Sequence, residues 1–291
     1  MESLLDRLPS GSRIAVIRLR SLGDCVLTTP ALALLKNHRP DLKITVIVEP
    51  RFAAIFEGNP DVDEIREDAC PADMALNLHG GSQSMWLTLQ ARAKLRAGFA
   101  HHRYRFIYSH KIPRAQEILK VHRRVHTAEH LASAMFWLGV PQSEIPRAKL
   151  TAEPPPALPP YAVIHPFASS PDKTWRAERF IEVARRLSGL EPVFLAGPGD
   201  DPSPFESFRV WNNEPLGRVK SLMAGASLFI GNDSGPAHIA AAFGVPVVVL
   251  FGSSEPTTWA PWRTESQVLA GLPNVSCDHV LTAIEALKVR V

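Results

Sequence analysis

The sequence has few cysteines and no long hydrophobic run. Its three cysteines, Cys25, Cys70 and Cys277, lie far apart in the chain. An odd number without close spacing excludes a disulfide framework and argues against a zinc site. No stretch approaches the roughly 18 apolar residues that a membrane-spanning helix needs. We therefore expect a reduced protein of the cytoplasm.

The N-terminal segment lacks the features of a secretory signal. Glu2 and Asp6 are acidic, and no apolar stretch accompanies them, so we do not expect export. The composition lacks extremes as well, with 45% apolar and 21% charged residues, as in ordinary globular proteins. A chain of 291 residues is about two domains long.

Several common motifs are absent. The chain has no Walker A, G-x-S-x-G or H-E-x-x-H motif. Residues 197–202 (GPGDDP) begin like a dinucleotide fingerprint but lack its third glycine, which is weak evidence for NAD. Asp61 and Asp63 have the D-x-D spacing of a metal–diphosphate site, but we interpret this segment as a loop. The His101–His102 pair has no partners at ligand spacing, and we assign it to a solvated basic patch.

Positive charge is concentrated in one part of the chain. Residues 1–150 hold 21 Lys and Arg against 15 Asp and Glu, whereas residues 151–291 hold 11 against 14. Between Arg92 and His126, ten Lys or Arg and five His accompany one acid. Such a cluster predicts an anionic partner, with a solvated helix face as the alternative. Nucleic acid is not the expected partner, because no zinc-finger or RNP-type motif is present.

A proline-rich segment marks the predicted domain boundary. Five of the seven residues from Pro154 to Pro160 are proline, which excludes a helix or a central strand. We expect residues 154–160 to form a stiff linker. It would join an N-terminal domain of residues 1–153 to a C-terminal domain of residues 161–291.

Both halves alternate between strand-like and helix-like segments. We predict strands at 13–18, 43–48, 73–78, 161–165, 192–196, 227–230 and 245–251. We predict helices at 30–37, 84–97, 127–138, 176–187, 236–243 and 279–288, the first opened by Thr29 as N-cap and Pro30 as N1. Continuous apolar strands indicate parallel sheets that helices cover on both faces. The predicted fold is therefore α/β, with two doubly wound domains and ligands held in a cleft at the carboxyl ends of the strands.

The sharpest local signal is GNDSGPAH at residues 231–238. It lies between a predicted strand and a predicted helix, where free N–H groups and the helix dipole bind phosphate. Ser234 adds a hydroxyl group and His238 an imidazole. The alternative is that Asp233 or Ser234 only caps the helix.

Two further loops carry candidate residues. Residues 165–175 (HPFASSPDKTW) follow a predicted strand and contribute Lys173, which could pair with a diphosphate or be an ordinary surface lysine. Residues 18–25 (RLRSLGDC) place Asp24 in the first loop of the first domain. A carboxylate there could act as a general base, or Asp24 could be a turn residue beside Gly23.

Together these segments resemble glycosyltransferase family 9, the ADP-heptose:lipopolysaccharide heptosyltransferases. The similarity is carried by residues 14–36, 59–65, 76–81, 128–141 and 231–262. It implies a GT-B fold of two Rossmann-like domains, the first holding mainly the acceptor and the second mainly the nucleotide sugar. It also implies an inverting transfer that needs neither a metal nor a cofactor.

The resemblance assigns roles residue by residue. Asp24 matches the general base of the family and Lys173 its phosphate-contacting lysine. The remaining nucleotide-sugar residues are Ser169, Asp233, Ser234, Gly235 and His238. We expect the basic segment to bind phosphates or carboxylates of a lipid A–Kdo acceptor, and to contact the anionic surface of the inner membrane. Its candidate acceptor-binding residues are Arg92, Lys94, Arg96, Arg103, Arg105, Lys120, Arg123 and Arg124.

The chain also departs from the family pattern. The stretch 199–216 looks short, as if a helix and a strand were trimmed, and Asp200 or Asp201 would have to bind the nucleotide ribose. Asn77 and His79 stand where an Asp and a Gln are common. The expected function is heptose transfer from ADP-heptose to the lipopolysaccharide inner core. The alternatives are a relative that uses another nucleotide sugar, an NAD-dependent oxidoreductase, or a two-domain sugar-binding protein of the transport type.

Overall fold

The chain forms two compact units, Met1–Leu150 and Thr151–Val291. The structure is a computed structural model that describes residues 3–155 and 159–289. Residues 156–158 of the predicted proline-rich linker therefore lie outside the described residues. No helix in these described ranges is both long enough and apolar enough to cross a membrane.

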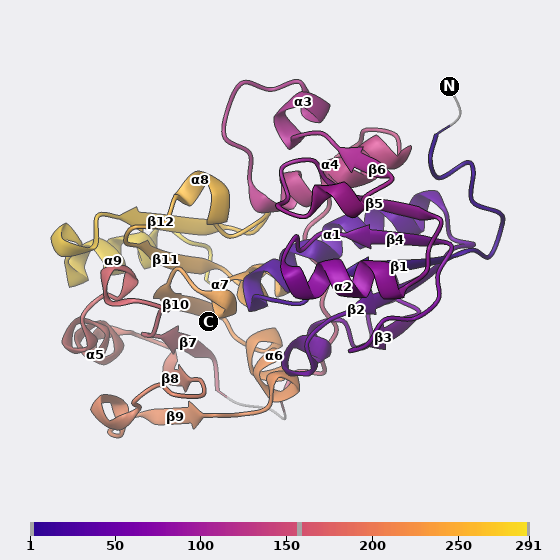
Figure 1. Ribbon diagram of the computed structural model, residues 1–291. Coiled ribbons are helices and arrows are strands. Elements are labelled where there is room, and N and C mark those ends of the chain that lie inside the picture. Colours follow the sequence, from indigo (N-terminus) through magenta and orange to yellow (C-terminus); the bar gives the residue numbers. More distant parts are fainter. Residues whose placement is uncertain (1–2, 156–158, 290–291) are drawn as a thin grey trace. The chain divides into compact units, whose positions relative to one another are not determined.

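The first unit is built on a six-stranded parallel sheet with helices on both faces (Figure 1). Its strand order is β3-β2-β1-β4-β5-β6. The strands are β1 (Arg13–Ile17), β2 (Lys43–Ile47), β3 (Glu64–Arg66), β4 (Met74–Asn77), β5 (Leu95–Phe99) and β6 (His110–Ile112). Ile17 in β1 is level with both Ile47 and Asn77. The apolar side chains of β1 are fully buried, as the continuous apolar run predicts.

The helices of the first unit are divided between the two faces of its sheet. They are α1 (Leu22–His38), α2 (Ser82–Gln90), α3 (Ala115–Leu119) and α4 (Thr127–Leu138), with 3₁₀ turns η1 (Pro50–Ile55) and η2 (Arg105–Ile107). Helices α1 and α4 pack against each other, whereas α2 packs on β1 and β4. Because α1 and α2 connect strands on opposite sides of β1 and β4, right-handed crossovers place them on opposite faces.

The second unit repeats this plan with its own six-stranded parallel sheet. The strands are β7 (Tyr161–His165), β8 (Glu191–Ala196), β9 (Arg209–Asn212), β10 (Leu228–Asn232), β11 (Val247–Phe251) and β12 (Ser266–Ala270). The helices are α5 (Ala177–Arg186), α6 (Leu216–Ala224), α7 (Gly235–Phe243), α8 (Pro256–Trp259) and α9 (Cys277–Glu285), with 3₁₀ turns η3 (Pro171–Lys173), η4 (Ser203–Phe205) and η5 (Leu272–Asn274). Helices α5 and α9 pack together, and so do α6 and α7.

The two units have the same topology. The second sheet is ordered β12-β11-β10-β7-β8-β9, so each sheet reads 3-2-1-4-5-6 when its strands are numbered from its own first strand. This is the doubly wound order of dinucleotide-binding folds. The predicted α/β class with two doubly wound parallel sheets is therefore confirmed.

The first predicted helix begins eight residues too late. The helix α1 starts at Leu22 and contains Pro30 in its interior, so Thr29 and Pro30 do not open it. Pro30 has no N–H for the carbonyl of Val26, one turn earlier. The hydroxyl group of Thr29 donates to that carbonyl at 2.9 Å and replaces the missing backbone hydrogen bond.

The predicted helix over 84–97 is also wrong at its end. Helix α2 stops at Gln90, and residues 95–99 form β5. Arg92 has a φ of 52°, a conformation that ends a helix, and the following residues pair with β4. In the second unit, the stretch 199–216 does contain a strand, β9, while the expected helix is reduced to the three-residue turn η4.

Candidate active site

In each unit the carboxyl ends of two neighbouring strands mark the place where the strand order reverses. In the first unit these strands are β1 and β4, and in the second they are β7 and β10. Doubly wound sheets bind ligands at this switch point, because the connections on its two sides leave in opposite directions. The predicted residues Asp24, Lys173 and Asp233 all follow one of these strands.

Asp24 lies in the first turn of α1 and not in a loop, which corrects the sequence prediction. It is the third residue of the helix, after the N-cap Ser21. Its Oδ2 accepts hydrogen bonds from the Ser21 hydroxyl at 3.0 Å and from the Ser21 amide at 3.4 Å. The side chain remains 21% exposed. The carboxylate is thus held in place by the helix end but is still accessible.

Arg18 is a neighbour of Asp24 that the sequence reasoning missed. It follows β1 directly, and its side chain is almost fully buried. One guanidinium nitrogen donates to Oδ1 of Asp24, and the other donates to the carbonyl oxygen of Leu78 at 2.7 Å. Arg18 therefore connects the ends of β1 and β4 and places a positive charge against the carboxylate. The signal was present in the sequence, as an arginine immediately after an apolar strand.

Four histidines gather beside this ion pair. We call His79, His101, His102 and His130 the histidine cluster. The His130 ring stacks on Phe99 with 4.0 Å between ring centroids, and the His101 ring lies 5.1 Å from His102 and 5.5 Å from His130. These rings come from the loops after β4 and β5 and from α4, which the fold brings together at the carboxyl edge.

The His102 ring is held from two sides. Its Nδ1 lies 3.1 Å from the hydroxyl oxygen of Tyr108. A Cβ atom on Gly80 would lie 2.6 Å from the ring, and Gly80 has a φ of +83°. A side chain at position 80 would therefore both strain the backbone and displace the imidazole.

Burial lowers the pKa of the histidines in the cluster. It lowers the pKa of His102 to about 3 and that of His130 to about 4, and the charge of Arg18 adds to both effects. The pKa of His79 is lowered as well, first by burial and then by Arg18. The assignment of the His101–His102 pair to a solvated, charged patch is therefore wrong for His102. His102 and His130 are instead neutral imidazoles near neutral pH.

The predicted acceptor-binding residues fall into two groups. Arg92 and Lys94 precede β5, so they lie at the amino edge of the parallel sheet, opposite the edge that carries Asp24. Arg96 lies within β5, where its guanidinium donates to the backbone carbonyls of Ala93 and Ile107 at 3.0 and 2.9 Å. These three residues are not brought together with Asp24.

The other basic residues follow β5 or β6 and belong to the carboxyl edge. They are Arg103, Arg105, Lys120, Arg123 and Arg124. Arg123 and Arg124 line a pocket of about 490 Å³ together with Arg114 and His122. Arg123 also pairs with Glu129 at 2.6 Å, and one acidic residue, Glu117, lines the pocket. A pocket rich in arginine at this edge can hold an anionic group.

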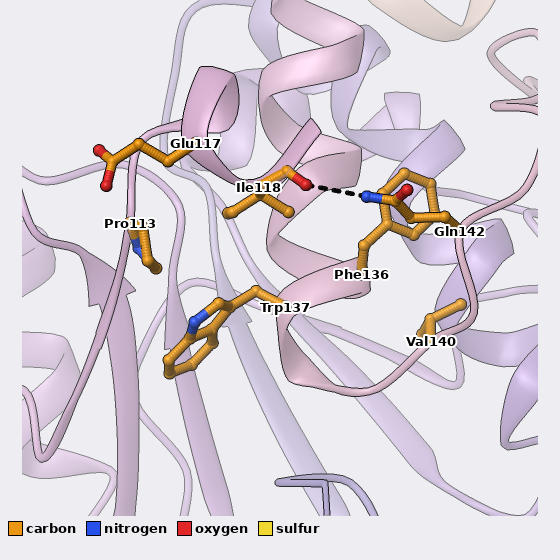
Figure 2. A pocket seen from close by; sticks show the side chains of 7 residues that line it. All are labelled: Pro113, Glu117, Ile118, Phe136, Trp137, Val140 and Gln142. Carbon is orange, nitrogen blue, oxygen red and sulfur yellow. Dashed lines mark hydrogen bonds between the residues drawn. The ribbon is translucent and has the colours of Figure 1, made fainter. Parts of the chain in front are cut away.

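A second pocket in the first unit contains none of the predicted site residues. It measures about 400 Å³ and lies between α3 and the end of α4. Figure 2 shows its lining, with the Gln142 side chain donating to the carbonyl oxygen of Ile118 at 2.9 Å. Phe136 and Trp137 contribute apolar surface. It has no link to Asp24.

In the second unit, Lys173 and Asp233 are brought together. Lys173 ends η3, in the loop after β7, and Asp233 follows β10. Burial raises the pKa of Asp233, and the side chain of Ser254 and then the positive charge of Lys173 oppose this effect. The two residues, 60 positions apart in the chain, therefore share the switch point of the second sheet.

The N-terminus of α7 has no side-chain cap. Ser234 is the N-cap residue, but its hydroxyl donates to the carbonyl oxygen of Asn232 at 3.1 Å and accepts no hydrogen bond from the backbone amides of α7. The alternative that Ser234 acts only as a helix cap is thus wrong. His238 is buried in the first turns of α7, with its ring centroid 6.4 Å from that of Trp259.

Asn232 is a second residue that the sequence reasoning missed. It is fully buried at the end of β10. Its side-chain oxygen accepts from the Trp175 amide at 3.0 Å, and its side-chain nitrogen donates to the Pro166 carbonyl at 2.8 Å. These bonds fix both ends of the loop that contains Ser169 and Lys173. Ser169 itself lies in the exposed part of this loop.

Asp200 and Asp201 shape the turn after β8. Asp200 accepts from the Gly197 amide at 2.7 Å, and Asp201 accepts from the Ser203 amide at 3.0 Å. Both residues thus have a structural role, and Asp201 is exposed. Across the described ranges, no group of three or more His, Cys, Asp or Glu side chains is placed to hold a metal ion.

The chain is similar in sequence to known glycosyltransferases. The model of the family described as glycosyltransferase family 9 (heptosyltransferase) matches residues 68–286. The chain is 27% identical over 292 residues to lipopolysaccharide heptosyltransferase 3 of Escherichia coli, and the match covers 84% of each chain.

Solved structures of this kind share the fold. The chain is similar to a glycosyl transferase family 9 protein from Veillonella parvula, with a TM-score of 0.85, 23% identity and coverage of 95% and 97% of the two chains. It is also similar to the E. coli heptosyltransferase WaaC with ADP, with a TM-score of 0.79, 20% identity and coverage of 94% and 99%. The predicted GT-B fold is confirmed.

Proposed function

The chain belongs to glycosyltransferase family 9 and is a glycosyltransferase, and on this premise we propose that it transfers heptose from ADP-heptose to the lipopolysaccharide inner core. The names of its relatives support the sugar and the acceptor, and ADP in the E. coli neighbour supports the nucleotide. The observation that carries the proposal is that Lys173 and Asp233, from separate loops, share the switch point beside the N-terminus of α7, close enough for the charge of Lys173 to counteract the rise in the pKa of Asp233.

We assign the donor pyrophosphate to this part of the second unit. The N-terminus of α7 offers roughly half a positive charge and free backbone N–H groups. Lys173 supplies a full positive charge, and Ser234, Gly235 and His238 lie in the same turn. Ser169 contacts the diphosphate from the loop after β7. In this proposal, these groups stabilise the charge of the departing ADP without a metal ion.

The chemical step is a single displacement at the anomeric carbon. The acceptor hydroxyl oxygen forms a bond to this carbon as the bond to the ADP oxygen breaks, and the configuration inverts. Asp24 accepts the proton of the hydroxyl group as general base. Arg18 and Ser21 act as positioning residues, because their hydrogen bonds fix the direction of the carboxylate.

We assign the acceptor to the carboxyl edge of the first unit. Its anionic groups would be bound by Arg103, Arg105, Lys120, Arg123 and Arg124. Because Arg92 and Lys94 belong to the other edge of the sheet, and Arg96 lies within β5 and binds backbone carbonyls, we leave these three residues out of this site. The lipid A–Kdo acceptor is a glycolipid, so the proposed place of action is the cytoplasmic side of the inner membrane.

The deciding experiment offers the enzyme ADP-heptose and lipopolysaccharide that lacks inner-core heptose. We expect ADP release together with one added heptose mass on the acceptor, unaffected by EDTA. The nucleotide is tested separately by thermal shift with ADP, UDP and GDP, where only ADP should stabilise the protein clearly. Stabilisation by UDP or GDP alone would instead favour the family member that uses another nucleotide sugar. Binding of NADH would favour the oxidoreductase.

A further inference from the structure

The first unit has an exposed apolar surface that the proposed reaction does not use. Among the described residues, the large hydrophobic side chains with the greatest exposure are Phe106 at 74% and Trp86 at 60%. Leu89 is 38% exposed. We call Trp86, Leu89 and Phe106 the apolar patch. Exposed apolar side chains that lie close together, unlike single scattered ones, mark an interaction surface.

The members of the apolar patch come from two segments that pack together. Trp86 and Leu89 are three positions apart on α2 and therefore share one face of the helix. Phe106 lies in the segment between β5 and β6. The chain neighbours of Trp86 and Phe106, Met85 and Ile107, belong to one buried cluster. The patch is thus anchored from beneath by a small core of its own.

The charge around the apolar patch has a single sign. The chain contains no Asp or Glu between Asp73 and Glu117. Arg92 and Lys94 are exposed just after α2, and Arg103 and Arg105 are exposed just before Phe106. Positively charged residues therefore stand at both sequence boundaries of the patch, without a nearby carboxylate from the same segment.

We propose that the apolar patch docks the first unit onto the surface of an anionic lipid bilayer. Tryptophan and phenylalanine insert at the level of the lipid headgroups. Arginine and lysine near the surface are attracted to anionic lipids. A protein partner fits less well, because it would have to place acidic side chains on both sides of the patch, whereas an anionic bilayer is negative over its whole surface. The docking also gives a role to Arg92 and Lys94, which have none in the proposed acceptor site.

This proposal rests on the proposed function only in that a glycolipid acceptor lies in such a bilayer. Binding to vesicles requires no sugar transfer, so the two proposals can fail separately. Trp86, Leu89 and Phe106 have no place in the proposed reaction. Activity toward a water-soluble, deacylated acceptor should therefore be unchanged when the patch is altered.

The test measures binding of the full chain to vesicles by co-sedimentation. Vesicles of phosphatidylcholine alone are compared with vesicles that also contain phosphatidylglycerol, with no substrate present. We expect binding to the anionic vesicles only, weakening as salt is raised. The double variant Trp86→Ser/Phe106→Ser should bind at least about tenfold more weakly. Arg92→Gln/Lys94→Gln should weaken binding roughly 10- to 30-fold, since each basic residue contributes about fivefold at an anionic surface.

Two matched controls come from the second unit. Val268→Ser removes a side chain that is 37% exposed, and Arg176→Gln/Arg185→Gln removes two exposed cations. Both should bind vesicles like the wild type. The proposal is overturned if the patch variants also bind like the wild type, or if the wild type binds neither kind of vesicle. It is equally overturned if Trp86→Ser/Phe106→Ser changes only the oligomeric state in size-exclusion chromatography, which would make the patch an interface between copies.

Discussion

The two units carry the same strand order but opposite chemistry at the same place. In both, the loops after the first and fourth strands of the unit form the switch point. The first unit fills it with a carboxylate, an arginine and neutral imidazoles. The second fills it with a lysine and an uncapped helix N-terminus. The shared topology therefore fixes where ligands bind, and the loop residues decide which ligands they are.

The comparison extends to the last helix of each unit. Helix α4 follows β6 and packs on α1, just as α9 follows β12 and packs on α5. Between the third and fourth strands the units differ, because the second unit has α6 there and the first has no helix. The scaffold is thus repeated more closely than the loops that would carry function.

The largest expected effect on activity comes from removing the carboxylate of Asp24 in the first unit. We expect Asp24→Asn to lower turnover by roughly 10²- to 10⁴-fold, the usual contribution of a positioned general base. ADP affinity should not change, because the donor is assigned to the second unit. Turnover is measured as ADP release, and affinity by titration calorimetry. Near wild-type turnover would remove Asp24 from the base role.

The reciprocal change concerns the positive charge of the second unit. Lys173→Ala removes a charge-assisted contact to the diphosphate, worth about 1.5–3 kcal/mol, so ADP should bind roughly 10- to 100-fold more weakly. Lys288→Ala is the matched control, because Lys288 is exposed near the C-terminal end of the same unit. Equal ADP affinities of the two variants in calorimetry would show that Lys173 does not contact the nucleotide.

The first unit should be more sensitive to acid than the second, because more of its histidines have a lowered pKa. Burial lowers the pKa of His130 to about 4 and that of His102 to about 3 in the first unit. In the second unit burial lowers the pKa of His165. The unfolded chain binds these protons near the ordinary pKa of about 6.5, whereas the folded chain binds those of His130 and His102 only near pH 4 or below. The free energy of unfolding is therefore highest above about pH 6.5 and decreases as the pH falls toward 4.

For His130 alone, this loss amounts to about 2 kcal/mol between pH 7 and pH 5. We expect His130→Phe to reduce it, because phenylalanine keeps the stacking on Phe99 but cannot be protonated. Hydrogen exchange of peptides from α4 and α9 at the two pH values measures each unit separately. Equal destabilisation of both peptides, or no effect of His130→Phe, would contradict the expected difference.

These results indicate which features a sequence reveals on its own. Long apolar segments were predicted well, and the limits of α4 and β7 are confirmed at Thr127–Leu138 and Tyr161–His165. Short edge elements such as β6 and β12 were missed, because their polar residues give no periodic signal. The start of α1 was missed because Thr29 and Pro30 look like the first residues of a helix. In the fold, the hydrogen bond that the Thr29 hydroxyl donates to the carbonyl of Val26 compensates for Pro30 inside the helix.

The candidate site was predictable only where a motif lies within one stretch of chain. The segment 231–238 could be interpreted from its spacing alone. The histidine cluster joins separate segments, so local patterns contain no trace of it. Arg18 and Asp24 lie within one stretch, but their spacing alone does not show that the two side chains meet. His102 appeared exposed and charged in the sequence because its neighbours Tyr108 and Gly80 become contacts only in the fold.

The smallest expected effects concern one position that is equivalent in the two units. The fourth strand of each unit ends in a fully buried asparagine, Asn77 in β4 and Asn232 in β10. Asn77 accepts from the amides of His79 and Gly80 at 3.0 and 2.9 Å and donates to the hydroxyl of Thr88 at 2.9 Å, so it holds the loop and the helix α2 that directly follow it. Asn232 instead holds the loop after β7, which comes from a distant part of the chain.

Replacing either asparagine with alanine leaves buried polar groups unpaired, and each variant should lose about 1–3 kcal/mol of stability. Their functional effects should differ. Asn232→Ala loosens the loop of Lys173 and should weaken ADP binding, whereas Asn77→Ala should leave ADP binding intact and lower turnover through the loop beside Asp24. Chemical denaturation, calorimetry and ADP release measure the three quantities. If both variants weakened ADP binding equally, the division of labour between the two switch points would be wrong, because the first unit is proposed to hold none of the donor.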